Sequence, residues 1–545
     1  MSKKYSSIIV ILINVLISLF CLSCSNEILN IDNEFDFPLV SSSEEIVLGT
    51  KRENPFKKSN SRSIVSVEQE TNFVYFKIRT NNLENIEKLE NLLGTLNTTP
   101  LDYEVIEGGC SFPQNEGSDE YSPWFYAMTP KTIFLLAQKL GEFEVIEEMY
   151  LSDEDLECFT EGGCEISNSA RFLWFNYTRV RPSGYVYFYD EVRQTYIPLK
   201  NVKVIVSQWC HVKSTYTDEN GFYDIGENFT SCWQNTANIK ICFETYKDSV
   251  YPSISPIKAF YNAGDKKISS LSGNDIYLAK DTIQNSFGIL LNATVMYRMY
   301  SKEDGITEPN SLKFWASQAL DGGVTLMRDV IAVDAAAVGA AIGTGIVPGV
   351  GTVVGTLGGA SLALYLPDII IPIKTVTGKS KTETITEMVF HEMSHASHYT
   401  SIGNGKITYW NEEYIQMLGG WLELLCNGES PINNCYNDGS SKQVCFIESW
   451  GFFYGYLLTK KYFRGYSIEF NYYFYLRNSY AFPYFYHTVF YKLYDILPIS
   501  VIFEPYRYFS VNSIGDWYNK LLDLHEGIDS DNTIYNTLIN SGIVL

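Results

Sequence analysis

In the second half of the chain, three residues have the spacing of a metal site. His391, Glu392 and His395 form a His-Glu-x-x-His pattern within the segment TETITEMVFHEMSHASHYTSIG. Residues four positions apart share one face of a helix, so both imidazoles can reach one zinc ion. Glu392 would lie beside the first ligand, where a carboxylate can take a proton from water that zinc has made more acidic. The pattern therefore predicts a zinc site with Glu392 as the catalytic base.

The segment around this pattern is expected to form one helix. Thr384 and Glu387 have the spacing of a capping box at its start, and Gly403 is a suitable residue for its end. His398 falls on the same face as the two ligands. In a straight helix it would lie too far along the axis from His391 to share the ion. We therefore expect His398 to pack near the site and not to bind the metal.

A third zinc ligand has to come from elsewhere in the chain, and two positions compete for this role. Glu412 and Glu413 follow the pattern in the segment TYWNEEYIQM. Glu448 lies in VCFIESWGFFYGYLL, an apolar and aromatic segment that predicts a helix. An unpaired carboxylate in such surroundings is unfavourable unless a metal compensates it. We favour Glu448, with Glu412 or Glu413 as the alternative.

The overall composition argues against nucleic acid as a partner. The chain has 545 residues, with 41 Lys and Arg against 63 Asp and Glu, which gives a formal net charge of -22. Neutralising phosphates needs clustered positive charge. Hydrophobic residues make up 46% of the chain, which is ample for folded cores and excludes disorder throughout.

The first 23 residues predict a signal for export. Lys3 and Lys4 precede an apolar stretch over residues 8–20, which is the pattern of a secretory signal peptide. Ser23 and Cys24 at its end resemble the lipobox of bacterial lipoproteins. That resemblance implies a lipid on Cys24, which would hold the exported protein to a membrane, with the outer membrane or cell surface as the expected place. An exported chain can also keep disulfides, although their pairing does not follow from the sequence.

After this signal, residues 24–66 are polar and predict a tether. Residues 67–160 alternate between strand-like and helix-like segments, which predicts a small α+β domain. Residues 181–282 contain short segments with period-2 alternation and predict a β-sandwich. From residue 283 to 545 the pattern becomes mainly helical, with helices expected over residues 283–301 and 311–333. The expected fold class is therefore multidomain α+β, ending in a mainly α-helical catalytic domain.

Two features support the β-sandwich. Val202, Val204 and Val206 would share one face of a strand. Asn220 and Gly221 form a strong signal for a tight turn, because both residue types tolerate positive φ.

Two parts of the chain resemble known families. Residues 181–282 resemble the carboxypeptidase regulatory-like domain, a transthyretin-like sandwich, in Gly184-Tyr185-Val186, in Pro198-Leu199 before Asn201-Val202, and in Thr217-Asp218 before Gly221-Phe222. This resemblance implies a support module without an active site. The His-Glu-x-x-His helix, followed by Glu448 in Glu-Ser-Trp-Gly, resembles zincin metallopeptidases of the gluzincin type. That second resemblance implies hydrolysis of peptide bonds in a peptide or protein substrate, with His391, His395 and Glu448 as ligands.

Two alternatives remain open at this stage. The uncharged, glycine-rich run over residues 335–367 could form a membrane-inserting hairpin or a buried hairpin within the catalytic region. We favour the buried hairpin, because Gly and Pro interrupt the run. For the whole protein, the alternative to a peptidase is a surface binding or adhesion lipoprotein whose zincin domain is structural or vestigial. The sequence predicts no oligomeric state.

Overall fold

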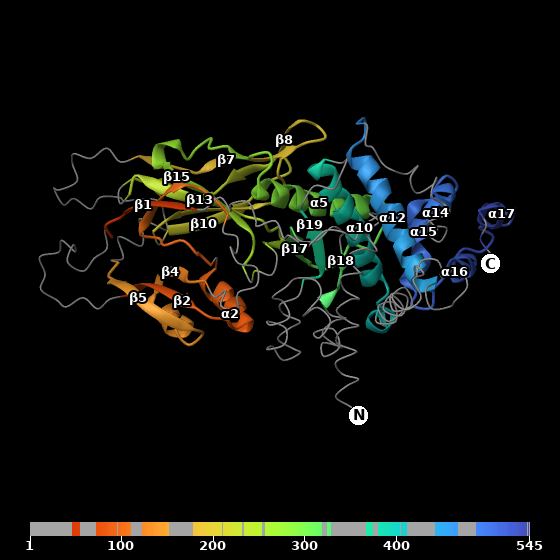
Figure 1. Ribbon diagram of the computed structural model, residues 1–545, viewed down its shortest axis with the longest axis horizontal. Helices are drawn as coiled ribbons and strands as arrows, with labels where there is room; N and C mark the ends of the chain where they lie inside the picture. The colour runs from red at the N-terminus through yellow and green to blue at the C-terminus, as the bar shows by residue number, and fades with distance from the viewer. Residues whose placement is uncertain are drawn as a thin grey trace, which may run out of the picture. The chain divides into compact units, whose positions relative to one another are not determined.

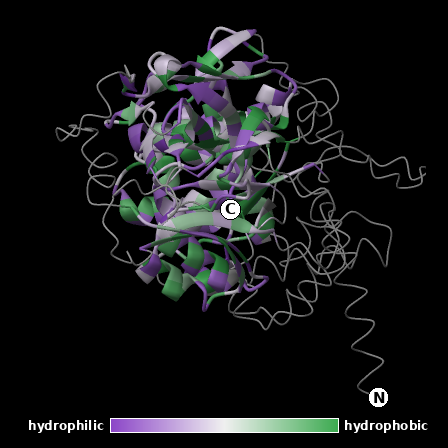
Figure 2. Cartoon of the chain, turned by 90° about the vertical axis from the view of Figure 1, so that its left-hand side faces the viewer, coloured by the Kyte–Doolittle hydropathy of each residue, from purple (hydrophilic) through white to green (hydrophobic). Residues whose placement is uncertain are grey.

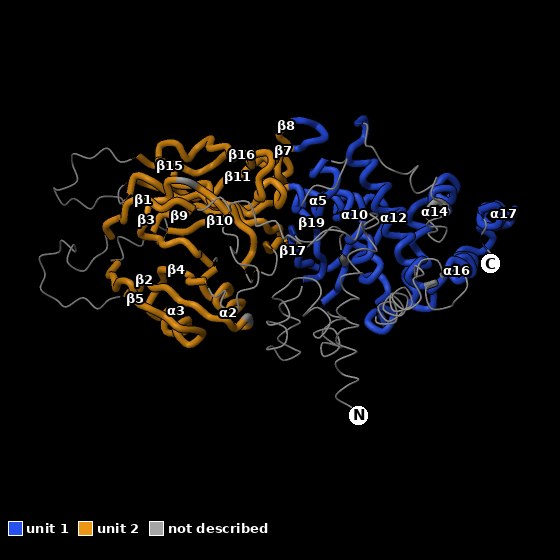
Figure 3. Tube along the Cα trace, viewed as in Figure 1, with its two compact units in different colours: residues 1–37, 190–194, 289–545 blue, residues 38–189, 195–288 orange. Residues whose placement is uncertain are grey.

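The computed structural model describes residues 46–54, 72–94, 96–110, 123–151, 178–209, 211–231, 234–252, 255, 257–318, 324–328, 367–373, 380–403, 405–410, 442–466, 487–541 and 543. Its contacts divide the chain into two compact units (Figure 3). Unit 1 takes in Asp190–Gln194 and the described part of Ile289–Leu545. Unit 2 takes in the described residues before Asp190, together with Thr195–Gly288.

The first part of unit 2 is a small antiparallel sheet with two helices. Its strand order is β4-β2-β5, and β1 and β3 pair separately. Val74, Phe76 and Ile78 alternate along β2 and are buried against helix residues that include Ile86 and Leu89. The alternation of strand and helix expected over residues 67–160 is present. The elements are β1 (Val47–Lys51), β2 (Phe73–Arg79), α2 (Leu83–Leu93), β3 (Tyr103–Glu107), β4 (Phe125–Pro130), α3 (Lys131–Ala137) and β5 (Glu142–Met149).

The rest of unit 2 is built from short strands. One sheet has the order β10-β9-β13-β15, another has the order β11-β7-β16 with β8 beside β7, and β6 pairs with β12. The elements are β6 (Arg179–Val180), β7 (Ser183–Asp190), β8 (Thr195–Pro198), β9 (Lys203–Gln208), β10 (His211–Tyr216), β11 (Phe222–Asp224), β12 (Phe229–Thr230), β13 (Thr236–Cys242), β14 (Ser249–Pro252), β15 (Phe260–Lys267), η2 (Ile268–Ser270) and β16 (Ile276–Leu278).

Both features that favoured a sandwich are confirmed in these strands. Val202, Val204 and Val206 are fully buried. Gly221 adopts a φ of 74°, and its amide donates to the carbonyl of Asp218 in the turn that leads into β11. Trp209, at the end of β9, packs against Tyr75 and Met149 of the small α+β part. The regions predicted as separate domains thus share one compact unit, and their boundaries at residues 160 and 181 stay predictions.

Unit 1 is mainly helical, with a small sheet beside its helices (Figure 1). In this sheet β19 lies between β17, to which it is parallel, and β18, to which it is antiparallel. Most of α5 also belongs to this unit. The elements are α5 (Ile283–Glu303), β17 (Lys313–Ser317), β18 (Val324–Thr325), β19 (Ile369–Pro372), α10 (Lys381–Ser401), α12 (Lys442–Tyr462), α14 (His487–Tyr494), α15 (Ile499–Phe503), η4 (Glu504–Arg507), α16 (Ile514–Leu524) and α17 (Thr533–Asn540).

The predicted fold class, a mixed α+β chain with a helical C-terminal region, is confirmed, but the helix expected over residues 311–333 is wrong. Strands β17 and β18 occupy the described part of that range. Phe314, Trp315 and Ala316 are all buried, so β17 is apolar on both faces. A strand buried on both faces loses its period-2 alternation, and periodicity alone cannot then distinguish it from a helix.

Helix α10 begins one turn earlier than expected. Its N-cap is Ser380, whose side chain accepts a hydrogen bond from the backbone N–H of Glu383. The capping box predicted at Thr384 is wrong, because Thr384 is buried inside the helix. The Ser/Thr-x-x-Glu spacing occurs twice at the start of this segment, at Ser380 and at Thr384, and the earlier copy is used. The predicted end is correct: Gly403 adopts a φ of 66° directly after the C-cap.

In Figure 2 hydrophobic and hydrophilic residues are mixed along the described elements. No helix among the described residues is long and apolar enough to cross a membrane. Several predicted features lie outside the described residues: the signal segment, Cys24, almost all of the run over residues 335–367, and both Glu412 and Glu413.

Candidate metal centre

The site is built on two helices of unit 1 that pack closely in opposite directions. Helix α10 is buried along most of its length. A Cβ added to Gly451 on α12 would lie against His395 and His391, and one added to Gly455 would lie against the backbone of His391. Moving toward the C-terminus of α12 therefore means moving toward the N-terminus of α10. This antiparallel contact runs directly behind the two histidine side chains.

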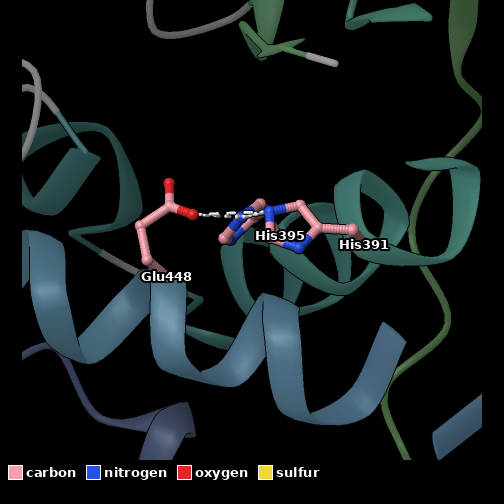
Figure 4. A group of neighbouring side chains, drawn as sticks. All are labelled: His391, His395 and Glu448. Atoms are coloured by element: carbon pink, nitrogen blue, oxygen red, sulfur yellow. Dashed lines mark hydrogen bonds and ion pairs between the residues drawn. The ribbon is translucent and has the colours of Figure 1, made fainter. Parts of the chain in front are cut away.

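Three side chains converge between these helices, as Figure 4 shows. The Nε2 atoms of His391 and His395 lie 3.0 Å apart. Oε2 of Glu448, from α12, lies 3.4 Å from Nε2 of His391 and 3.7 Å from Nε2 of His395. The side chains are nearly enclosed, with exposed fractions of 9%, 4% and 12% for His391, His395 and Glu448. Among the described residues this group could hold a metal ion.

The separations within this group fit a zinc ion. Zinc binds imidazole nitrogen and carboxylate oxygen at about 2.0–2.2 Å in tetrahedral geometry. Two ligand atoms of such a tetrahedron are about 3.3–3.6 Å apart. The three separations lie close to this range, and imidazole nitrogen and carboxylate oxygen are ligand types that zinc prefers. Because this group has three protein ligands, a tetrahedral zinc ion bound to it would have a fourth position for water or substrate.

Glu448 is held in its charged form. Burial alone would raise the pKa of this carboxyl. The charge of His395 and hydrogen bonds from both His391 and His395 act in the opposite direction and outweigh burial. The pKa of Glu448 therefore lies well below its usual value, and a permanently ionised carboxylate is what a metal ligand requires.

Glu392, next to His391, has a raised pKa, in contrast to Glu448. The side chain is buried, and burial raises its pKa to about 7 despite the opposing effects of His391 and Thr325. The hydroxyl of Thr325, on β18, donates to Oε2 of Glu392 at 2.6 Å. This hydrogen bond fixes the carboxyl in one orientation beside the ligand group. A carboxyl with a pKa near 7 can both accept and release a proton at neutral pH.

His398 lies apart from the ligand group. It is buried, and its ring centroid is 5.0 Å from that of Tyr506, 5.5 Å from that of Tyr409 and 5.8 Å from that of Trp410. The same Trp410 lies 6.2 Å from the ring of His395. His398 thus belongs to an aromatic layer that packs against α10 near His395.

The sequence reasoning missed three residues of the site. Thr325 lies in the range that was expected to be helical, so nothing in the sequence pointed to its contact with Glu392. Gly451 and Gly455 do have a detectable signal, because small residues four positions apart allow helices to approach closely. A Cβ at Gly451 would come within 2.7 Å of Cε1 and Nε2 of His395, so the site needs a residue without a side chain there.

The two candidates for the third ligand can be separated by substitution. We expect Glu448→Ala to lower zinc affinity by more than about 100-fold, because even residues that only contact a ligand contribute about 10–100-fold. Glu413→Ala, the matched control, should leave zinc affinity nearly unchanged. Competition with a chromophoric chelator measures both. The reverse ranking would assign the ligand to Glu413.

The glycine contact gives a second test. Gly451→Ala should lower zinc affinity by at least about tenfold, because the new methyl group displaces the ring of His395. Gly515→Ala on α16 is the control, since a Cβ there meets nothing closer than Ser513 Oγ at 3.8 Å. That control should bind zinc like the wild type. Equal zinc affinities in the two variants would show that α12 does not approach the ligands this closely.

Comparison with known proteins adds nothing to this geometry. No protein-family model matches the chain, and neither does any curated protein or solved structure. The chemistry of the site therefore has to be argued from its own residues. Those residues form a buried group of two histidines and a glutamate, with the spacing of a His-Glu-x-x-His helix, that could hold a metal ion.

Proposed function

We propose that the protein is a zinc-dependent metallopeptidase. The observation that carries this proposal is the convergence of His391, His395 and Glu448 on one point, with the buried carboxyl of Glu392 beside them. A site that only held a structural ion would have no need of a fixed, proton-accepting carboxyl next to a ligand. Structural zinc sites also commonly use four protein ligands, whereas this group supplies three among the described residues.

The proposed division of labour follows from the side chains. When bound, zinc supplies Lewis acidity, which makes water a stronger acid and a carbonyl carbon a better electrophile. Glu392 accepts the proton that water loses during attack and returns it to the departing amine nitrogen. Thr325 holds Glu392 in place through its hydrogen bond. Burial of the group keeps bulk water away from these steps.

Peptide-bond hydrolysis is the reaction best matched to this arrangement. A His-Glu-x-x-His helix with the intervening Glu as base is the pattern of metalloproteases. The alternative is a surface binding or adhesion protein in which the same site is structural or vestigial. The raised pKa of Glu392, near 7, favours the peptidase, because it suits proton transfer at neutral pH.

We further propose that the enzyme is exported and anchored by a lipid on Cys24. The charged and apolar pattern of the first 23 residues supports this. A second observation comes from α12, where Cys445 is disulfide-bonded. Disulfides persist mainly in exported proteins.

The role of Glu392 has a direct test. Glu392→Gln should retain zinc but lose about 100-fold or more of the rate of peptide cleavage, because the amide cannot accept the proton. Cleavage of unfolded casein and zinc content are the two measurements. Glu387→Gln makes the same chemical change on the same helix and should leave both at the wild-type level.

Two results would contradict the proposal in different ways. Undiminished cleavage by Glu392→Gln would remove Glu392 from the mechanism. If the wild type bound zinc but cleaved no member of a peptide library, the binding or adhesion protein would be favoured.

A further inference from the structure

A short segment of unit 1, Asp190–Gln194, makes contacts at the ends of both helices of the metal centre. The segment is internally ordered. Asp190 is fully buried, and its Oδ1 accepts hydrogen bonds from the backbone N–H groups of Val192 at 2.9 Å and Arg193 at 3.0 Å. Its Oδ2 accepts from the guanidinium of Arg193. Asp190 thus ties the turn together and orients Arg193.

Glu191 of this segment binds the N-terminus of α10. Oε2 of Glu191 accepts a hydrogen bond from the backbone N–H of Lys381 at 2.6 Å. The backbone N–H of Glu191 donates to the hydroxyl of Thr382 at 3.0 Å. A helix N-terminus carries unpaired N–H groups and a partial positive charge, both of which favour a carboxylate. Glu191 therefore supplements Ser380 in capping the helix that carries both histidines.

Arg193 binds the C-terminus of α12. Its guanidinium donates to the carbonyl oxygen of Tyr462, the last residue of that helix. The guanidinium carbon also lies 4.4 Å from the ring centroid of Tyr462, 5.0 Å from that of Phe463 and 5.5 Å from that of Tyr466. A cation is favourable at the negative end of a helix and over aromatic rings. Arg193 therefore fixes the end of the helix that carries Glu448.

These two contacts act on helix ends that lie beside each other, because α10 and α12 are antiparallel. A packing contact leads from this end toward the ligands. The ring of Tyr462 lies 6.1 Å from that of Phe390, the residue directly before His391. The hydroxyl of Tyr462 also accepts from the side chain of Asn292 on α5 at 3.0 Å. A shift of α12 along its axis would break these contacts and change the distance from Glu448 to both imidazoles.

We propose that Glu191 and Arg193 are positioning residues that hold the register of α10 against α12, and with it the separation of His391 and His395 from Glu448. Neither side chain belongs to the ligand group. One five-residue segment supplies a negative charge to the positive end of one helix and a positive charge to the negative end of the other. This inference rests on the proposed metal function, but the register itself exists without the ion.

The test uses Arg193→Ala and Glu191→Ala in the full chain, with Arg193→Lys and Glu191→Gln as conservative variants. Arg181→Ala is the control, since it removes another arginine that pairs with an aspartate, Asp224, and both of these residues belong to unit 2. Zinc affinity and the visible spectrum of the cobalt-substituted protein are measured. We expect the two alanine variants to bind zinc about tenfold more weakly and to shift the cobalt bands. The conservative variants should recover part of both, and the control should match the wild type.

Hydrogen exchange of the metal-free protein separates this inference from the proposed function. Faster amide exchange confined to α10 and α12 in the alanine variants would support the positioning role, whether or not the wild type binds zinc. Absence of zinc binding by the wild type would contradict the proposed metallopeptidase function alone. The positioning role would be overturned if both alanine variants had the same zinc affinity, cobalt spectrum and amide exchange as the wild type. A lower melting temperature with an unchanged cobalt spectrum would also overturn it, because that result describes a purely structural contact. If an alanine variant does not fold, its conservative partner provides the same measurements.

Discussion

The close packing of α10 against α12 places a carboxylate and two imidazoles together where almost no solvent reaches them. Burying a charge is strongly unfavourable unless a partner compensates it. Here Glu448 is compensated by His391 and His395, and an ion between them would compensate it further. Other contacts near the site hold α10 and α12 in this close packing. Gly451 and Gly455 permit the approach of α12, and a 2.7 Å hydrogen bond between the hydroxyls of Tyr297 on α5 and Ser397 holds α10 from another side.

The two buried carboxyls of the site have pKa values that are shifted in opposite directions. Glu448 faces two basic rings, which keep its pKa low. Glu392 is also buried, but the charge of His391 and the hydroxyl of Thr325 lower its pKa by less than burial raises it. Pairs of titratable groups whose surroundings push their pKa values apart are characteristic of sites in which the two groups have different roles. The proposed roles of Glu448 as ligand and Glu392 as base rest on this difference as well as on the spacing in sequence.

Much of this site could be predicted from the sequence because its chemistry depends on local spacing. The distance between His391 and His395 is set by helix geometry, and Glu448 is the one charged residue of the apolar and aromatic segment VCFIESWGFFYGYLL. The same reasoning failed for β17 and β18, because a strand buried on both faces has no periodicity to detect. Thr325 was missed for that reason.

Contacts between distant segments were also beyond the reach of the sequence. Glu191 and Arg193 lie in a turn that has no pattern of its own, and their role depends on where two helix ends meet. The capping box at Thr384 was misplaced by one turn, because two copies of the same spacing occur and only the packing of Thr384 decides between them. Local patterns identified the three side chains that could hold a metal ion, whereas Glu191 and Arg193 could only be found in the structure.

The central claim is that His391, His395 and Glu448 together hold one zinc ion. A crystal structure of the zinc-loaded protein, with anomalous data on both sides of the zinc absorption edge, tests it most directly. The account predicts one strong anomalous peak at about 2.0–2.2 Å from Nε2 of each histidine and from a carboxylate oxygen of Glu448. A peak coordinated by another acid with Glu448 turned away, or the absence of any peak between α10 and α12, would contradict it.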